Sequence, residues 1–468
     1  MEPKYIAVIE IGSATIRGAV GSVDATGGIT LLAVEETPAA GSVRYGRVQN
    51  AREVSGRADE IVRRLENNPA VAPARITAVY LAVGGRSLAS AASEASVNQT
   101  DEAEVTPHTI ERLHKEARYN LGIDRDVLSI DPRRYMVDNA EVKNPVGAFG
   151  RRVSGEFTFI TCSPENMRSL KRVSVTSGDR DIEREYITRL PAQADMALTD
   201  TDRQLGCLFI DFGAETTTIA VYRDGALQMA AALPMGSHNI TRDLTAGLGI
   251  TEDSAEHLKL TKGMAVTERA NIDAPDAQTR EIINYVSARV GEIVANIVHV
   301  VTHAGFRPDE LKAGIVATGG GSRLAGLMPT LEAQTRMKVR LAAVDRSIRA
   351  ASPDIHPADA FDLLALIKYA ADHAPGRSCL TVPEPAGARA AAAAPQTGVV
   401  QPRRTISESD PCLLDDEDLD SPVTVNGDDD TLPEPDEDPN VTRRSLLDRF
   451  KNWIAPKVDD NLDDEEDE

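Results

Sequence analysis

The chain has 468 residues, 41% hydrophobic and 26% charged, which is typical of a soluble globular protein with room for two or three domains. Its four cysteines show no CxxC spacing, so the sequence favours neither a zinc site nor a disulfide framework. No segment approaches the roughly 18 consecutive apolar residues of a membrane-spanning helix. The first residues run directly into a strand pattern, so we also expect no signal peptide.

The net charge of −22 is concentrated in the C-terminal part of the chain. Residues 380–468 contain 24 acidic and 8 basic side chains, whereas residues 1–379 contain 49 acidic and 43 basic ones. An acidic chain with a nearly balanced body does not suit a nucleic-acid partner, and we expect none.

Two stretches of the sequence share one pattern. In residues 5–21, two apolar runs flank a short turn at Gly12, which predicts a strand, a tight turn and a second strand. Residues 208–222 repeat this pattern around Gly213, and a further apolar strand follows each copy. One such hairpin is common in purely structural turns, but two copies about 200 residues apart indicate an internal duplication.

The duplication predicts a cleft with one phosphate-binding turn on each wall, because small residues at a tight turn offer backbone N–H groups to an anion. An acid precedes each turn, Glu10 in the first and Asp211 in the second. Since carboxylates repel phosphate, these acids imply a Mg²⁺ ion, held at Asp211 through water, or a water molecule that they orient. Gln193, just before the second hairpin, is another candidate for orienting water, and its alternative is an ordinary helix residue.

Apolar periodicity places the remaining elements. Residues 76–83 predict a strand, and Thr251 is expected to cap a helix. In residues 86–163 the pattern of polar and apolar residues changes. This change predicts an inserted α+β subdomain with short strands such as 153–161. Further helices are predicted at 52–68, 107–120, 164–175 and 282–305.

A third loop follows a buried strand near residue 313. Its glycines would let the backbone approach a flat or bulky ligand closely, although the same pattern also fits a tight strand-to-helix turn. Earlier in the chain, Glu256 and Lys259 share one helix face, an arrangement that is usually a solvated ion pair. The loop consists of Gly319, Gly320, Gly321 and Ser322.

Residues 375–441 are rich in proline, alanine and acids, which predicts a disordered linker. Residues 442–457 then predict a short basic amphipathic helix that lies in a membrane interface. Docking in a partner's groove, or folding onto the body of the protein, are its alternatives. An acidic tail, 458–468, follows. The expected lipid-contacting residues are Arg443, Arg444, Leu446, Leu447, Arg449, Phe450, Lys451, Trp453 and Ile454.

Taken together, the two hairpins and the glycine loop resemble the actin, Hsp70 and sugar-kinase superfamily. Within it the chain is most similar to the FtsA family of bacterial cell-division proteins. The segments that carry this resemblance are Glu10-Ile-Gly-Ser-Ala-Thr15, residues 76–85, Asn144-Pro-Val-Gly147 and residues 313–320. The resemblance spans about residues 4–374 and the C-terminal helix.

The resemblance implies an α/β, actin-like two-lobed ATPase fold with duplicated β-sheet domains. The first lobe would comprise residues 1–84 and 164–190, with an FtsA-type subdomain inserted at 85–163. The second lobe would comprise 191–248 and 311–374, with a helical subdomain at 249–310.

The resemblance also assigns roles to particular residues, with ATP and Mg²⁺ as the implied ligands. The implied adenosine contacts are Gly236, Glu256, Lys259, Gly319, Gly320, Gly321 and Ser322, and the implied catalytic residues are Glu10, Asp211 and Gln193. The phosphate would be bound by Gly12, Ser13, Ala14, Thr15, Gly213, Ala214 and Thr216.

The implied function is that of an ATP-binding protein that polymerises on the cytoplasmic face of the inner membrane and tethers FtsZ there during septum assembly. Its implied partners are the FtsZ C-terminal peptide, other copies of itself, other divisome proteins and anionic lipid. Two departures, Glu10 in place of the usual aspartate and Glu215 in place of the usual glycine, predict slow or negligible ATP hydrolysis. A small-molecule kinase or an Hsp70-like chaperone on the same fold is the alternative.

Overall fold

The computed structural model describes residues 3–267, 276–373 and 378–382. The predicted acidic linker, the amphipathic helix at 442–457 and the acidic tail lie outside these residues, as do all of the expected lipid-contacting side chains. In the described part of the chain, no helix combines the length and the hydropathy that crossing a membrane requires.

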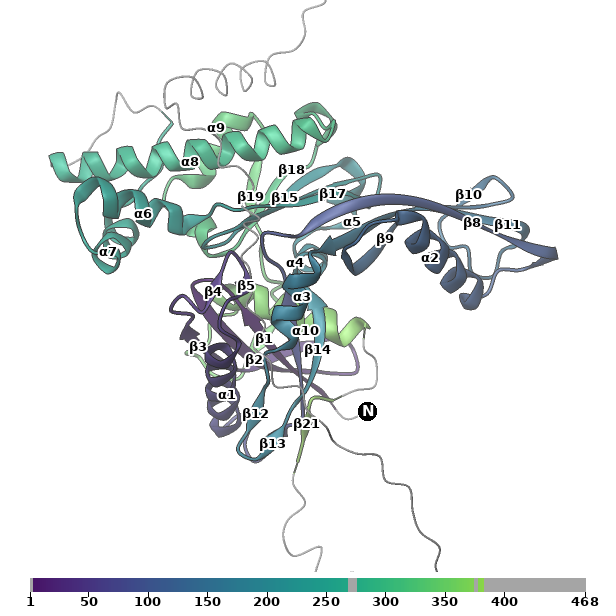
Figure 1. The fold of residues 1–468 in the computed structure, drawn as a ribbon, viewed down its shortest axis with the longest axis horizontal. Helices are drawn as coiled ribbons and strands as arrows, with labels where there is room; N and C mark the ends of the chain where they lie inside the picture. The colour runs from purple at the N-terminus through teal and green to yellow at the C-terminus, as the bar shows by residue number, and fades with distance from the viewer. Residues whose placement is uncertain (1–2, 268–275, 374–377, 383–468) are drawn as a thin grey trace, which may run out of the picture. The chain divides into compact units, whose positions relative to one another are not determined.

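The first hairpin and its neighbours form a six-stranded sheet in the order β14-β7-β1-β2-β3-β20 (Figure 1). β1, β2 and β3 are an antiparallel meander, and β7 and β14 continue the sheet in parallel from β1. The short β20 closes the far edge beside β3. The strands are β1 (Lys4–Ile11), β2 (Thr15–Val23), β3 (Ile29–Pro38), β7 (Ala78–Val83), β14 (Glu183–Thr188) and β20 (Arg349–Ala350).

The second hairpin builds a sheet with the same strand order. β15, β16 and β17 are again an antiparallel meander, and β18 and β19 again continue it in parallel. Five strands of each sheet therefore correspond one to one, which confirms the duplication predicted from the hairpins. The strands are β15 (Cys207–Phe212), β16 (Thr217–Arg223), β17 (Ala226–Leu233), β18 (Gly314–Thr318) and β19 (Val339–Leu341).

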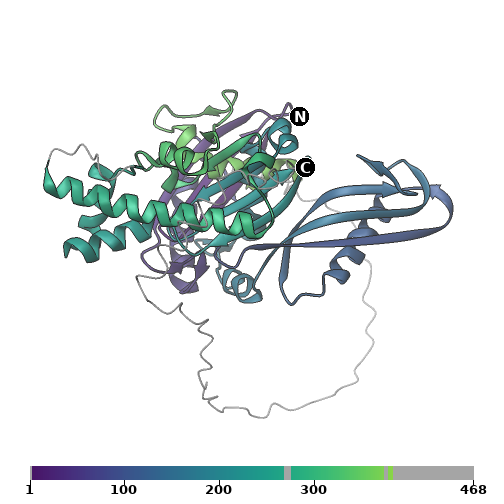
Figure 2. The same cartoon turned by 90° about the horizontal axis from the view of Figure 1, so that it is seen from above.

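The inserted subdomain extends the second sheet. β8 pairs with β17 through Ala89 and Ala231, and β11, β9 and β10 follow, so nine strands form one sheet (Figures 1 and 2). The prediction of short strands here was wrong, because the insert's three main strands have 16, 12 and 14 residues. These long strands are stabilised by pairing with one another, between residues far apart in the sequence. The local sequence does not show that pairing. The elements are β8 (Ala89–Glu104), α2 (Pro107–Leu121), β9 (Asp126–Val137), β10 (Ala140–Val142) and β11 (Phe149–Cys162).

Helices pack against the first sheet. α1 (Ala51–Asn67), capped by the Asn50 side chain, packs on β2 and β3, and α10 (Phe361–His373) packs on β1, β2 and β7. α3 (Pro164–Lys171) ends four residues earlier than predicted. The strand predicted at 76–83 is interrupted at Thr77, where the backbone turns to donate to Cys379 O and β6 (Arg75–Ile76) pairs with β21 (Leu380–Thr381).

The second sheet is buried on both faces. Along β15, Leu208, Ile210 and Phe212 belong to a core with α8 (Ala277–His303), whereas Phe209 belongs to a core with α4 (Arg189–Ala197). This alternation follows from the two-residue period of a strand. The other helices of this lobe are α5 (Asp200–Leu205), α6 (Ser237–Leu248), α7 (Glu252–Lys262) and α9 (Leu327–Thr335).

Small elements complete the described chain. α4 and α10 contact each other, and each follows the last strands of its own half of the duplication. The remaining strands are β4 (Val43–Arg44), β5 (Arg47–Val48), β12 (Thr176–Ser177) and β13 (Arg180–Asp181). Short 3-10 turns lie at Pro308–Glu310, Gly320–Arg323 and Pro357–Ala360.

Candidate functional site

The two hairpin turns have the same backbone geometry. In the first, the Gly12 N–H donates to Thr15 O at 3.0 Å, and in the second the Gly213 N–H donates to Thr216 O at 2.9 Å. A Cβ atom at either glycine would lie within 2.8 Å of that carbonyl oxygen, at 2.8 Å for Gly12 and 2.7 Å for Gly213. Glycine is therefore required at both turns by the closeness of the backbone, which explains the shared sequence pattern.

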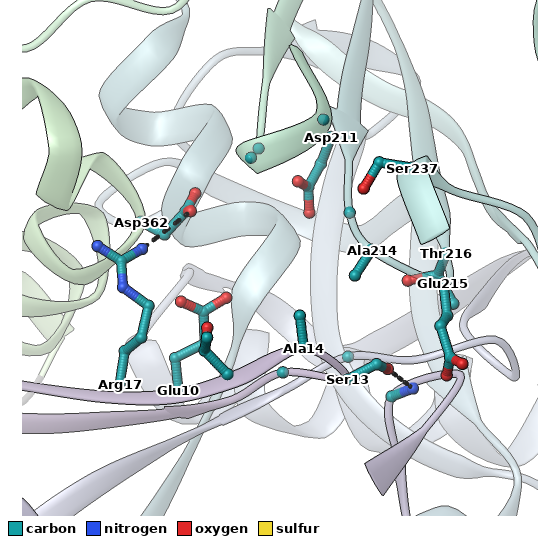
Figure 3. A pocket seen from close by; sticks show the side chains of 18 of the residues that line it. Glu10, Ser13, Ala14, Arg17, Asp211, Ala214, Glu215, Thr216, Ser237 and Asp362 are labelled. Carbon is teal, nitrogen blue, oxygen red and sulfur yellow. Dashed lines mark hydrogen bonds and ion pairs between the residues drawn. The ribbon is translucent and has the colours of Figure 1, made fainter. Parts of the chain in front are cut away.

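Both turns open into one cavity of about 430 Å³, a size that suits a small-molecule ligand. Ala14 of the first turn and Ala214 of the second point into the space between the hairpins (Figure 3). The end of β7, the face of α7 and the glycine loop after β18 supply the other walls. The predicted residues in the lining are Glu10, Gly12, Ser13, Ala14, Thr15, Asp211, Gly213, Ala214, Thr216, Glu256, Lys259, Gly319, Gly320 and Gly321.

Three predicted residues are not part of this lining. Gly236 caps the start of α6, whose Ser237 N–H donates to Gly213 O at 3.0 Å and so supports the second turn from behind. The Ser322 hydroxyl turns back to donate to Gly319 O at 2.6 Å. Gln193 is buried, and its amide donates to Asp362 Oδ1 at 2.7 Å. These three residues support the walls of the site and do not face the cavity.

At the base of the cavity, one arginine joins the two predicted acids. Arg189, the first residue of α4, donates to Glu10 Oε1 at 2.8 Å and to Asp211 Oδ2 at 2.5 Å. A third acid, Asp362 at the start of α10, lies 4.0 Å from Arg17. The base of the site therefore contains three carboxylates and two guanidinium groups, and Arg189, Arg17 and Asp362 all line the cavity.

Burial dominates the electrostatics of this cluster. It raises the pKa of Glu10, with Asp362 adding to the effect and Arg189 opposing it. Burial likewise raises the pKa of Asp211, and Arg189 again opposes the shift. Burial lowers the pKa of Arg189, but Asp211 and Glu10 raise it by more, so the guanidinium stays charged.

Glu215, which stands where the resemblance expects glycine, lines the cavity, but its carboxylate is engaged by groups of both lobes. The side chain points away from the space between Ala14 and Ala214 (Figure 3). Its carboxylate accepts the Tyr45 N–H at 2.6 Å and lies 3.1 Å from Arg44 Nε and 2.8 Å from an Arg242 nitrogen. Glu215 thus connects the second hairpin to the β4–β5 turn of the first lobe.

In the pair of Glu256 and Lys259, the lysine is buried whereas the glutamate side chain is 41% exposed. Lys259 is 6% exposed, and its Nζ lies 2.6 Å from Glu256 Oε2 and 3.0 Å from Thr241 Oγ1. α7, which carries both residues, begins after Thr251, whose hydroxyl accepts the Ser254 N–H as predicted. Burial opposes ionisation of Glu256, but hydrogen bonds from Lys259 and Thr241 hold its pKa below the ordinary value.

Sequence reasoning missed the arginines and the third acid. Arg189 and Asp362 lie in the first turns of α4 and α10, which follow the last strands of the two duplicated halves. Extending the duplication from the hairpins to these helices would have identified both positions. Nothing in the local sequence singles out Arg44 or Arg242.

The paired hairpins, the repeated strand order and the shared cavity define an actin-like, two-lobed protein. The fold is similar to that of a solved structure described as a PilM–PilN type IV pilus biogenesis complex, with a TM-score of 0.54 and 14% identity over 78% of this chain and 97% of that chain. At this identity, the likeness concerns the fold alone.

The sequence comparisons narrow the class. Residues 208–358 match the family model for cell division protein FtsA, and residues 85–161 match the SHS2 domain inserted in FtsA. The chain is 29% identical over 356 residues to FtsA of Porphyromonas gingivalis, covering 72% of this chain and 73% of that protein. It is 26% identical over 361 residues to FtsA of Escherichia coli K12, covering 73% and 84%. By these matches, the chain is similar to the FtsA family of cell-division proteins over about 72% of its length.

Proposed function

We propose that this protein binds ATP in the cavity between its hairpins and works as a membrane-associated, polymerising scaffold of bacterial cell division. The observation that carries the nucleotide proposal is the symmetric pair of glycine turns opening into one cavity of about 430 Å³. Backbone N–H groups at such turns suit phosphate oxygens. The buried Lys259 and its partner Glu256, with the loop at Gly319–Gly321, supply a wall for the adenosine.

The test of this proposal is binding of a fluorescent ATP analogue to the full chain, followed by anisotropy and reversed by unlabelled ATP. We expect saturable binding that ATP competes away. A double substitution, Gly12→Ala with Gly213→Ala, should abolish binding because both turns would have to widen. Absence of competed binding in the wild-type protein would refute the proposal.

ATP turnover is proposed to be slow. Glu10 and Asp211, the two acids placed to orient a water molecule, are both engaged by Arg189, so neither is free to act as a base on an incoming water. Arg189, which engages both acids, is therefore the proposed cause of slow turnover. Phosphate release on the order of tens of turnovers per second, a rate within the range of efficient kinases, would contradict it.

The membrane role rests on the sequence of residues 442–457, which lie outside the described part of the chain. A single apolar stripe with basic flanks suits the interface of an anionic membrane on the cytoplasmic face, where the proposed polymer would assemble. Full-length protein should co-sediment with anionic liposomes in the presence of ATP, and protein truncated before residue 442 should not. Equal sedimentation of both would remove the tether from the proposal.

The proposed partner on the membrane is FtsZ, bound through its C-terminal peptide, with other divisome proteins joining the assembly. By family resemblance, the peptide would bind the helical subdomain at about residues 249–310, which includes α7 and α8. A labelled FtsZ C-terminal peptide should bind the full chain, and the same peptide with a scrambled sequence is the control. If only a metabolite were phosphorylated and no peptide bound, the kinase alternative would replace the scaffold.

A further inference from the structure

The two carboxylates that the sequence assigns to a Mg²⁺ ion already share a counter-ion. Arg189 donates to Glu10 Oε1 at 2.8 Å and to Asp211 Oδ2 at 2.5 Å. These acids belong to different lobes, Glu10 to β1 and Asp211 to β15. The guanidinium therefore occupies the space between them, where a cation bridging the two hairpins would have to lie.

A Mg²⁺ ion does not fit this arrangement. The ion binds a carboxylate either directly, at about 2.0–2.1 Å, or through one of its own waters, and a position between the two acids would use the oxygens that Arg189 already occupies, Glu10 Oε1 and Asp211 Oδ2. In both cases Arg189 would first have to move away. The Arg189 side chain is 16% exposed and cannot lose its proton, so displacement would leave a buried charge without its partners. Arg189 and the metal compete for the same carboxylates.

Arg189 also faces the cavity. It lines the space that the hairpins enclose, and its Nε lies 3.7 Å from the point where a Cβ on Gly84 would be. Beyond the two N–H groups bonded to the acids, the guanidinium keeps further donors, and its planar fork suits phosphate oxygens. Arg17, 4.0 Å from Asp362, adds a second guanidinium to the base of the cavity.

We propose that Arg189 takes the place of the divalent cation in this site, so that the phosphate chain of a nucleotide is neutralised by Arg189 and binding does not require Mg²⁺. The inference rests on the proposed nucleotide-binding function. The two proposals can be tested separately. A site that binds ATP only as its magnesium complex would satisfy the proposed function and contradict the role of Arg189.

The deciding experiment uses the full wild-type chain and a fluorescent ATP analogue, titrated once in Mg²⁺ and once in EDTA. We expect the two dissociation constants to differ by less than about threefold. Binding in Mg²⁺ that weakens by more than about threefold in EDTA would overturn the role of Arg189 and leave the proposed function intact. Absence of binding in both buffers would overturn both.

Substitution of Arg189 supplies a second, independent readout. In Arg189→Gln, the acids lose their counter-ion, so nucleotide binding should fall by more than about tenfold in EDTA and recover at least partly in Mg²⁺. In the absence of nucleotide, Mg²⁺ should raise the melting temperature of this variant and leave that of the wild type unchanged. Stabilisation of both proteins by Mg²⁺ to the same extent would count against the proposal.

Two controls separate this effect from a loss of folding. Arg189→Lys keeps the positive charge, and we expect it to bind in EDTA better than Arg189→Gln does. Arg203→Gln removes another arginine that is ion-paired to an acid, Asp195 at 2.6 Å, but lies outside the cavity lining. Arg203→Gln should leave the ratio of the two dissociation constants at its wild-type value. The circular dichroism spectrum of each variant reports whether it has folded.

Discussion

Replacing Glu215 with alanine should free the β4–β5 turn from the second hairpin. The carboxylate is 5% exposed and accepts the Tyr45 N–H at 2.6 Å, so the substitution removes a short hydrogen bond between two lobes. The two arginines that share the carboxylate keep access to water, because Arg44 is 45% and Arg242 is 34% exposed. The cost therefore comes mainly from the Tyr45 N–H.

The expected magnitude follows from these exposures. A hydrogen bond to a charged group contributes about 1.5–3 kcal/mol, and each partly exposed ion pair adds about 0–1 kcal/mol. Local opening at Tyr45 should then become about 2–4 kcal/mol easier in Glu215→Ala. The Glu215→Gln variant keeps an acceptor for the Tyr45 N–H and loses only the charge, so about half of the effect should remain.

Hydrogen exchange followed by mass spectrometry measures this opening without assuming that the lobes unfold together. A peptide covering residues 42–49 should exchange at least about thirtyfold faster in Glu215→Ala than in the wild type. A double-mutant cycle with Arg242→Ala would isolate the contribution of that ion pair. If the peptide exchanged at the same rate in both proteins, the contact between Glu215 and Tyr45 would not hold the lobes together.

Three further outcomes can be measured. Gly213→Ala should weaken binding of a fluorescent ATP analogue by more than about tenfold. The control is Gly56→Ala, which lies on the exposed face of α1 with no atom within 4 Å of the new Cβ. This variant should bind the analogue normally, and urea unfolding should show it to be more stable by about 0.5–1 kcal/mol. Lys259→Met leaves Glu256 without its cation, so the pKa of Glu256 should rise in a carboxyl-labelled NMR titration; an unchanged pKa would show that the pair is not coupled. Burial raises the pKa of Asp131 from 3.8 to about 6, so the folded state binds the proton more tightly. Its contribution to stability is therefore present below pH 3.8 and is lost as the pH rises to about 6, by about 3 kcal/mol at most. Urea unfolding of Asp131→Asn should lack this component, and identical pH profiles for the variant and the wild type would contradict the assignment.

The hairpins and their duplication could be read directly from the sequence. The alternation of apolar residues and the glycine at each turn are local requirements, since a Cβ at Gly12 or Gly213 would clash with a carbonyl oxygen three residues away. The cap of α7 at Thr251 and the extent of α1 could also be predicted from nearby residues. Side chains within one turn of a helix decide where it begins. The family followed from these short patterns in combination.

Only the tertiary structure decided the chemistry at the base of the cavity. Arg189 is 179 residues from Glu10 along the chain, and their contact depends on the packing of α4 between two sheets that the sequence does not place. For the same reason, the sequence did not show that the Glu215 carboxylate pairs with arginines of both lobes, Arg44 and Arg242. Local sequence fixes where a turn and its glycine lie, whereas the direction and pairing of a buried charge depend on which distant groups folding brings to it.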